Sequence, residues 1–339
     1  MRIDGRAFIF GAMFATGFWL FAYHIHDGSF VHEFIRAIPN VKPNTTGSKS
    51  NGSKTMIEKL GLGGVFGNDV KPKEIKKYGN TFWTKDMNTK IDYDQKEIQK
   101  FENGYSNLDD PALLNFIRQR WLVYPTKKPN ISSEPEKHYS QEKQSEYVDN
   151  YLKKQKNGFF VECGAADGVG LSNTMFFEKF RAWRGLLVEA NPQMYQNLKR
   201  SRPGSYSVNA CLSTSNKTMK VKFNPEGFLG QISTSNNGLQ VQCFPLFSLL
   251  QAIGVNTIDF FSLDVEGSEM GILETIPWDK IRINVLTIEY LVRSPKWRFH
   301  NSTAKLQALR DYFKKLKVYK ELATLSNLDI VLARKDMAN

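Results

Sequence analysis

Short apolar runs alternate with amphipathic segments along the carboxyl-terminal two thirds of the chain. A short apolar run is typical of a buried strand, whereas apolar residues that recur at helical spacing indicate a helix with one buried face. Strands separated by helices form a mostly parallel sheet that is covered on both faces. The sequence therefore predicts an α/β, doubly wound, Rossmann-like fold. We expect strands at residues 159–162, 186–189, 206–210, 258–264 and 284–289, and helices at 172–181, 193–201, 268–275 and 302–317.

Further elements are expected on either side of this alternation. A capped helix with Pro111 in its first turn and a second helix at 144–154 precede it. Ser302 or Thr303 is expected to cap the last helix. Short strands are expected at 219–223 and 241–244, around an insert rich in Gly, Asn and Ser, and an antiparallel pair at 318–322 and 328–333.

A glycine-rich turn follows the first predicted strand, and an acid closes the second. Gly164, Gly168 and Gly170 punctuate the turn, and Glu189 ends the next strand. Doubly wound sheets bind nucleoside ligands at the carboxyl ends of their strands. Glycines let the backbone approach such a ligand, and an acid about twenty residues on can accept both ribose hydroxyls. A tight turn without a ligand is the alternative interpretation.

The spacing of these glycines departs from the G-x-G-x-x-G pattern of dinucleotide enzymes. It fits the looser E/D-x-G-x-x-x-G turn of enzymes that bind S-adenosylmethionine, which we therefore expect as the cofactor. The residues expected to bind it are Glu162, Gly164, Ala166, Asp167, Gly168, Glu189, Asn191 and Asn209.

Asp264, Glu266 and Glu269 lie within six residues where the fourth predicted strand ends. That strand is expected beside the first, so its acids would face the same cleft. Carboxylates so close repel one another unless a cation, a donor or a proton relieves them. Asp264 or Glu266 is therefore a candidate general base toward a substrate hydroxyl. A purely structural helix start is the alternative, and no second ligand cluster supports a metal site.

Several other residues could border this cleft. Glu289 and Tyr290 could line its acceptor side, and residues 223–239, which include Phe228, could form a lid. Residues 293–300 could meet an acidic or sugar substrate by charge and stacking. An ordinary solvated role is the alternative for each.

Residues 7–23 form an uncharged, mostly apolar run close to the lower length limit for crossing a bilayer. Arg2 and Arg6 precede it, which favours a cytosolic amino terminus. A cleaved signal peptide is the rival, although no A-x-A site follows the run. We expect a cytosolic tail at 1–6, a signal anchor at 7–25, a stem at 26–105 and the folded domain at 106–335.

Glycosylation sequons agree with a body in the lumen of the endoplasmic reticulum or Golgi. The pattern N-x-[ST] alone arises often by chance, but two copies fall in the polar stretch after the predicted anchor. A single-pass type II membrane protein is therefore expected. The sequons begin at Asn44, Asn51, Asn130, Asn216 and Asn301.

The chain has 339 residues and a formal net charge of +12. An excess of positive charge is compatible with a nucleic-acid, membrane or acidic partner, or with an ordinary solvated surface. No nucleic-acid module is visible, so no nucleic-acid partner is expected. The three cysteines show no metal-binding spacing. Cys211 and Cys243 could pair in an oxidising lumen, and three free thiols are the alternative.

Several of these motifs together resemble the FkbM-type methyltransferase family. They are residues 160–168 (FVECGAADG), 171–174 (LSNT) and 185–192 (GLLVEANP). Residues 264–269 (DVEGSE) and 276–278 (IPW) are similar to the animal, Star-like branch of this family. The resemblance covers roughly residues 109–334. It implies a class I methyltransferase fold, S-adenosylmethionine as methyl donor and typically an oxygen acceptor.

Two functions follow from this resemblance. The first is S-adenosylmethionine-dependent O-methylation of a glycan or another hydroxyl-bearing lipid or small molecule. The second is a non-catalytic trafficking role, because Star-like proteins are membrane-anchored and associated with export of secretory cargo, and their domain need not be active. The resemblance matches Glu162, Gly164, Asp167, Gly168 and Glu189 to donor-binding positions, and Asp264 and Glu266 to an acidic motif.

Overall fold

The computed structural model describes residues 23–26, 29–32 and 80–337, with gaps at 89, 129–130, 234–237 and 293–297. The chain divides into two units, residues 1–68 and 69–339. In the first, strands β1 (Tyr23–His26) and β2 (Ser29–His32) form an antiparallel pair. The expected anchor at 7–25 lies mostly outside the described residues, and its last residues, from Tyr23, are strand rather than helix. No described helix combines the length and apolarity needed to span a bilayer.

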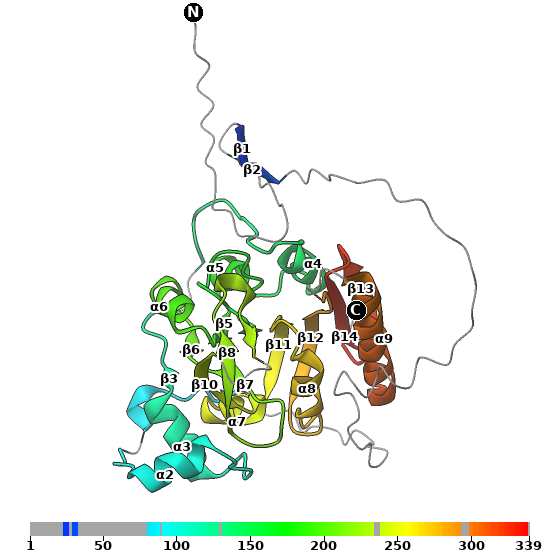
Figure 1. Ribbon diagram of the computed structural model, residues 1–339. Helices are drawn as coiled ribbons and strands as arrows, with labels where there is room; N and C mark the ends of the chain where they lie inside the picture. The colour runs from blue at the N-terminus through cyan, green and yellow to red at the C-terminus, as the bar shows by residue number, and fades with distance from the viewer. Residues whose placement is uncertain are drawn as a thin grey trace, which may run out of the picture. The chain divides into compact units, whose positions relative to one another are not determined.

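A large mixed sheet organises the second unit (Figure 1). Its eight strands follow the order β13-β14-β12-β11-β4-β5-β6-β3. The five central strands are parallel, and antiparallel strands close both edges. The parallel strands are β4 (Phe159–Cys163), β5 (Arg184–Val188), β6 (Tyr206–Val208), β11 (Thr257–Leu263) and β12 (Arg282–Glu289). The antiparallel strands are β3 (Leu122–Val123) at one edge, and β14 (Asp329–Arg334) followed by β13 (Tyr319–Leu325) at the other.

This strand order confirms the doubly wound, class I methyltransferase-like arrangement. The chain proceeds from β4 outward through β5 and β6, and then returns to build β11 and β12 on the other side of β4. The direction of winding therefore reverses between β4 and β11. A crevice forms at such a reversal, outside the carboxyl ends of the strands, and it is the usual ligand position in this class of sheet.

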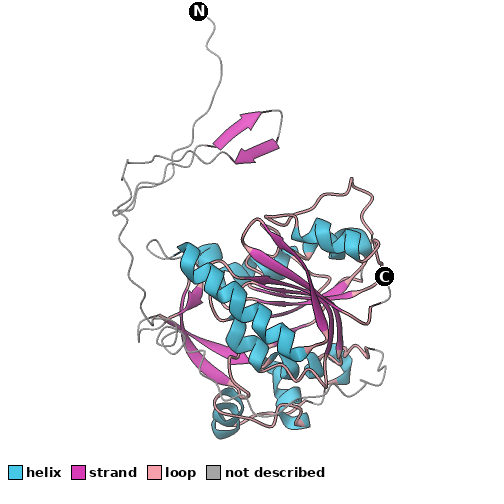
Figure 2. Ribbon diagram, turned by 90° about the vertical axis from the view of Figure 1, so that its right-hand side faces the viewer, coloured by secondary structure: helices cyan, strands magenta, loops and turns pink. Residues whose placement is uncertain are grey.

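Helices cover both faces of the sheet, as Figure 2 shows. Alternation of side chains along each strand directs Val161 to one apolar core and Phe160 to the other. The first core contains residues of α3 (Pro111–Arg120), α7 (Leu246–Ala252), α8 (Glu269–Glu274) and α9 (Arg298–Leu316). The second contains residues of α4 (Gln144–Tyr151), α5 (Met175–Arg181) and α6 (Pro192–Ser201).

One helix was missed by the sequence analysis, and one helix prediction needs correction. The sequence did not predict α7, whose almost uniformly buried residues show no amphipathic pattern. Helix α9 begins at Arg298, so neither Ser302 nor Thr303 is its cap. The Ser302 hydroxyl instead accepts a hydrogen bond from the Val292 N–H at 2.9 Å and so ties the helix to the end of β12.

The strands expected at 219–223 and 241–244 belong to a second, smaller sheet. It has the order β7 (Cys211–Leu212), β10 (Leu239–Phe244), β8 (Met219–Asn224) and β9 (Gln231–Ile232). Cys211 and Cys243 are register partners in β7 and β10 and form a disulfide, whereas the free Cys163 is buried. The alternative of three free thiols is therefore wrong.

The predicted boundary of the stem, near residue 105, lies too late in the chain. Thr81 and Trp83 donate backbone hydrogen bonds to Gly254 and Ile253 at 2.8 and 3.0 Å. Helix α2 (Gln95–Glu102) has a capping box, and its Phe101 is buried against the body. The polar exposed face of α2 explains why this segment has the composition of a linker. The folded body begins by Asn80 among the described residues.

The packing of α2 can be tested with Phe101→Ala. Phe101 is 3% exposed and makes an edge contact with Tyr105, so removal of its ring should lower the free energy of unfolding by about 3–5 kcal/mol. Chemical unfolding of the full-length chain in detergent would measure the change. Ile91→Ala is the matched control, because Ile91 is 41% exposed and should lose much less. If Phe101→Ala and Ile91→Ala had equal free energies of unfolding, residues 80–105 would belong to the predicted stem rather than to the folded body.

Candidate active site

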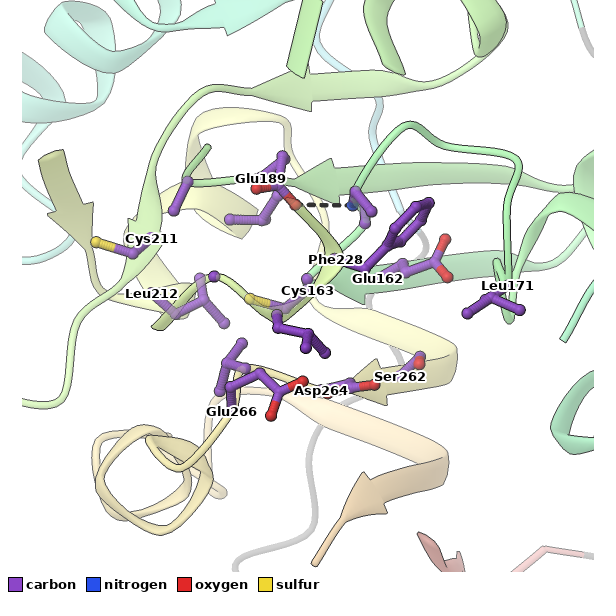
Figure 3. A pocket seen from close by; sticks show the side chains of 18 of the residues that line it. Glu162, Cys163, Leu171, Glu189, Cys211, Leu212, Phe228, Ser262, Asp264 and Glu266 are labelled. Carbon is purple, nitrogen blue, oxygen red and sulfur yellow. Dashed lines mark hydrogen bonds between the residues drawn. The ribbon is translucent and has the colours of Figure 1, made fainter. Parts of the chain in front are cut away.

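One cavity lies at the carboxyl ends of β4, β5 and β11, at the point where the winding reverses (Figure 3). Its walls include Val188 at the end of β5 and Ala210 to Leu212 beyond β6. Among the residues predicted from the sequence, it is lined by Glu162, Gly164, Ala166, Glu189, Asp264 and Glu266. Four predicted residues are absent from its lining and instead support the turn or hold Glu189: Asp167, Gly168, Asn191 and Asn209.

The glycine turn approaches the end of β11 so closely that only glycine fits there. Gly164 has φ +81°, and an added Cβ would lie 1.8 Å from the Asp264 carbonyl oxygen. The Gly164 N–H also donates to Val188 at 3.1 Å. This position therefore joins the turn after β4 to the ends of both β5 and β11, which brings Glu189 and Asp264 to the same cavity.

The Glu162 carboxylate is engaged mainly with the chain itself. It accepts hydrogen bonds from the Ser172 and Thr174 hydroxyls at 2.9 and 2.6 Å and from the Asn173 N–H at 2.7 Å. The Arg202 guanidinium lies 3.7 Å away and balances its charge. Glu162 therefore fixes residues 172–174, two of which also line the cavity, and its role there is to position the wall.

Glu189 lies at the opposite wall and is almost fully buried. Its two carboxylate oxygens accept hydrogen bonds from the N–H groups of Ala166 and Asn191 at 2.7 and 2.6 Å. Burial raises the pKa of Glu189 to about 7, although these backbone donors favour the charged form. The Asn209 side chain donates to the Glu189 carbonyl oxygen at 2.8 Å. Asn191 and Asn209 thus hold Glu189 in place.

Asp167 and Gly168 fix the conformation of the glycine-rich turn. One oxygen of the Asp167 carboxylate accepts hydrogen bonds from the N–H groups of Val169 and Gly170 at 2.9 and 2.8 Å. Gly168 has φ +81°, and a Cβ there would lie 3.3 Å from the Leu198 Cα. Both residues therefore support the turn against α6 and leave its other side to the cavity.

A cluster of mostly buried carboxylates lies behind the β11 side of the cavity, and of its three members Asp264 lines the cavity whereas Glu269 and Glu289 do not. Asp264, Glu269 and Glu289 each place a carboxylate oxygen within 4.8 Å of the others, a spacing that could hold a metal ion. The Lys305 ammonium lies 2.7 Å from Glu269 and supplies one positive charge. The sequence predicted no metal ligands, because Glu289 comes from β12 and only the pairing of β11 with β12 brings it here.

Burial raises the pKa of Glu289 well above the usual range of a glutamate, and the charges of Asp264 and Glu266 add to the effect. Glu269 is also buried, and its other carboxylate oxygen accepts hydrogen bonds from the N–H groups of Val265 and Gly267 at 3.1 and 3.2 Å. Glu269 therefore shapes the loop that carries Glu266. Asp264 and Glu266 themselves reach the cavity.

Backbone strain collects around the same cavity. Ala166, Leu171 and Glu266 adopt φ values of +47°, +60° and +55°, and all three line it. Residues other than glycine rarely adopt a positive φ, and those that do cluster at functional sites. The sequence contains no local signal for these positions.

Phe228, in the short helix η2 (Gly227–Leu229), borders the mouth of the cavity. Its side chain is 47% exposed, and its ring lies 3.1 Å from the position of a Cβ added to Gly170. The cavity encloses about 220 Å³. Ligand pockets usually enclose about 300–1,000 Å³, so this cavity is small for a cofactor site, and the lid suggested for 223–239 stays a prediction.

The model of the methyltransferase FkbM domain matches residues 162–317, which contain both walls of this cavity. The chain therefore carries an FkbM methyltransferase domain. S-adenosylmethionine is the cofactor of this domain. No curated protein matches the chain.

Solved methyltransferase structures are similar to this chain at low sequence identity. A human methyltransferase 10 domain containing protein is 12% identical, with a TM-score of 0.35, over 57% of this chain and 80% of its own. The methyltransferase FkbM from Methylobacillus flagellatus KT is 17% identical, with a TM-score of 0.36, over 70% of this chain and 59% of its own.

The residues of the FkbM methyltransferase domain fit the cofactor. Each oxygen of the Glu189 carboxylate accepts one N–H and keeps a second lone pair for a ribose hydroxyl. The turn at Gly164 presents backbone without a side chain toward the cavity. Glu189 would therefore bind the ribose, and the turn would border the rest of the cofactor.

Donor affinity should depend on the protonation of Glu189. Because its pKa is about 7, Glu189 is mostly neutral at pH 6 and mostly charged at pH 8. A charged carboxylate accepts hydrogen bonds more strongly, so the affinity for S-adenosylmethionine should rise by about tenfold between these pH values. Calorimetric titration of the full-length chain would measure this.

Glu189→Gln should weaken binding and remove the pH dependence. The exposed Glu274→Gln is the matched control and should change neither. If the unmodified chain bound S-adenosylmethionine equally well at pH 6 and pH 8, Glu189 would not be the ribose ligand.

Proposed function

We propose that this protein transfers a methyl group from S-adenosylmethionine to a hydroxyl oxygen of a glycan or another hydroxyl-bearing acceptor in the secretory pathway. One observation carries the proposal. Glu189, on the donor side, and the acids Asp264 and Glu266, on the opposite side, line the same cavity. Figure 3 shows these two walls on either side of the segment around Cys163. A donor held by Glu189 would therefore face groups that can accept a proton.

The chemistry requires little more than position and a base. S-adenosylmethionine supplies a methyl group on a sulfonium, which is electrophilic without further activation. The acceptor oxygen would form the new C–O bond as the methyl–sulfur bond of the donor breaks and its electron pair returns to sulfur, which leaves S-adenosylhomocysteine. The proton of the acceptor would pass to the carboxylate of Asp264 or Glu266. The fixed turn at Gly164 and the strained backbone at Glu266 would hold the donor and the base in the relative positions that the reaction needs.

We also propose that the domain lies in the lumen, behind an uncleaved membrane anchor, as in Star-like proteins. The apolar run at 7–23 and the sequons support this topology. The disulfide between Cys211 and Cys243 supports it independently, because such bonds persist in oxidising compartments.

A non-catalytic trafficking factor is the second candidate. The small volume of the cavity and the position of Phe228 at its mouth favour it, since a site that never bound a cofactor would stay closed. Calorimetric titration with S-adenosylmethionine separates the two functions. Binding at micromolar to submillimolar concentrations supports the enzyme, and no binding at millimolar concentration would support the trafficking role.

Asp264→Asn should separate chemistry from donor binding. The amide cannot take the proton of the acceptor, so methyl transfer should fall by about 10²- to 10⁴-fold while the affinity for S-adenosylmethionine stays within about twofold. Release of S-adenosylhomocysteine with a panel of neutral and acidic oligosaccharides would measure turnover.

Asp279→Asn, at an exposed residue in the turn between α8 and β12, is the control and should retain full turnover. Full turnover by Asp264→Asn would transfer the role of base to Glu266, and Glu266→Gln should then be inactive. Activity in both variants would exclude either acid as the base.

Topology can be tested through glycosylation. Asn216 is exposed, so in a lumenal body it should carry a glycan, and endoglycosidase treatment of the protein from animal cells should increase its gel mobility. Asn216→Gln should remove one step of that shift, whereas Asn224→Gln, outside any sequon, should not. A chain with no shift at all would contradict the lumenal location.

A further inference from the structure

A second groove lies at the other end of the sheet from the donor cavity. Arg184 and Tyr206, which line it, are the first residues of β5 and β6, whereas the donor cavity lies at the carboxyl ends of these strands. Five residues of β5 separate the two edges by ~13 Å. The groove encloses about 820 Å³, bordered by α3, β3 and residues 83–90, which Figure 1 shows at one side of the sheet. It is a separate site.

The groove is strongly basic. A single acid, Asp86, accompanies its cations. None of these cations forms an ion pair with a carboxylate among residues 80–337, where the structure describes them. The unbalanced charge attracts anions and would be screened by salt. The cations are Lys85, Lys90, Arg118, Lys127, Lys128 and Arg184.

The floor of the groove is rigid. The Asn88 side-chain oxygen accepts hydrogen bonds from the Trp83 indole N–H at 2.9 Å and from the Tyr124 hydroxyl at 3.0 Å. The Tyr206 hydroxyl donates to the Trp83 carbonyl oxygen at 2.7 Å. These bonds join residue 83 to Tyr124, which follows β3, and to β6 before any ligand arrives, which lowers the entropy cost of binding.

Arg118 lies beneath this floor. Its guanidinium lies 3.6 Å from the centre of the Trp83 ring and donates to the Ala252 carbonyl oxygen at 2.7 Å. Burial lowers the pKa of Arg118 from its usual value, which shows that the charge is poorly solvated there. An anion in the groove would relieve this unfavourable environment.

The aromatic rings of the groove and the proposed location of the protein indicate which class of polyanion would bind. Proteins that bind single-stranded nucleic acid stack bases on open aromatic faces. Here Arg118 covers one face of Trp83, and Tyr206 is buried, so its ring gives no platform. The exposed cations are mostly lysines, which suit separate anionic groups along a flexible chain. The choice of ligand rests on the lumenal location proposed above, which the disulfide supports and in which acidic polysaccharides are available as polyanions.

We propose that this groove binds a sulfated polysaccharide, with the sulfates paired to Lys85, Lys127, Lys128 and Arg184 around the rigid Asn88 floor. Binding at this edge leaves the donor cavity accessible. The groove would therefore hold the protein on a sulfated chain without occupying the site of methyl transfer.

The test measures the affinity of the full-length protein in detergent for a heparin octasaccharide. A single-stranded DNA with the same number of negative charges is the comparison ligand. Lys127→Glu combined with Lys128→Glu should weaken heparin binding by about tenfold or more, because two attractive contacts become repulsive. Both side chains are exposed, so the fold should be retained.

Lys153→Glu combined with Lys154→Glu is the matched control. It makes the same change of charge at another exposed lysine pair, beyond α4, and should change the affinity by less than about twofold. Thermal unfolding and S-adenosylmethionine binding should be unchanged in both variants. If the first variant is unstable, Lys127→Gln combined with Lys128→Gln replaces it and should weaken binding in the same direction.

An unchanged affinity in the groove variant would overturn the proposal. An equal loss in both lysine-pair variants would also overturn it, since it would indicate diffuse attraction to the whole basic surface. Tighter binding of the DNA than of heparin would assign the groove to nucleic acid instead.

Discussion

The close contact between the turn after β4 and the end of β11 is the constraint on which the site depends. A Cβ at Gly164 would lie 1.8 Å from the Asp264 carbonyl oxygen, so any other residue would force the two strand ends apart. The same turn bonds to Val188, at the end of β5. One residue without a side chain thus fixes the separation between Glu189 and Asp264. If these ends moved apart, each acid would keep its local environment but the two would no longer face one cavity.

The two sides of the cavity treat buried charge differently. On the β4 side, Glu162 is surrounded by hydroxyl and N–H donors, and the Arg202 guanidinium lies 3.7 Å away, so the polar groups around this acid form a connected network. On the β11 and β12 side, the carboxylates of Asp264, Glu269 and Glu289 lie within 4.8 Å of one another, the Lys305 ammonium lies beside Glu269, and the pKa of Glu289 is raised. Carboxylates that are buried so close together contribute little to stability, because desolvation opposes their charged forms. The arrangement is understandable if this side takes part in proton transfer or in binding a positively charged group.

The outer parts of the body reinforce this site and add a second one. The disulfide joins β7 to β10 and thereby fixes Cys211, which lines the donor cavity. Thr81 and Trp83 bond to Gly254 and Ile253 just before β11, at the opposite edge of the sheet, and this segment contributes Trp83 and Asn88 to the basic groove. The central strands separate the two sites, so each can be altered without direct effect on the other.

The sequence by itself determined the alternation of strands and helices, and the positions of Glu162, Gly164 and Glu189 at the ends of strands. It could do so because short apolar runs and glycine spacing are local properties of the chain. It did not reveal α7, whose burial on all sides removes the helical pattern, or α2, whose polar face has the composition of a linker. Only the tertiary structure decided that Cys211 pairs with Cys243, that Glu289 joins Asp264, and that Asn191 and Asn209 hold Glu189 rather than line the cavity. These outcomes depend on which strands become neighbours, and strand pairing joins residues far apart in the chain.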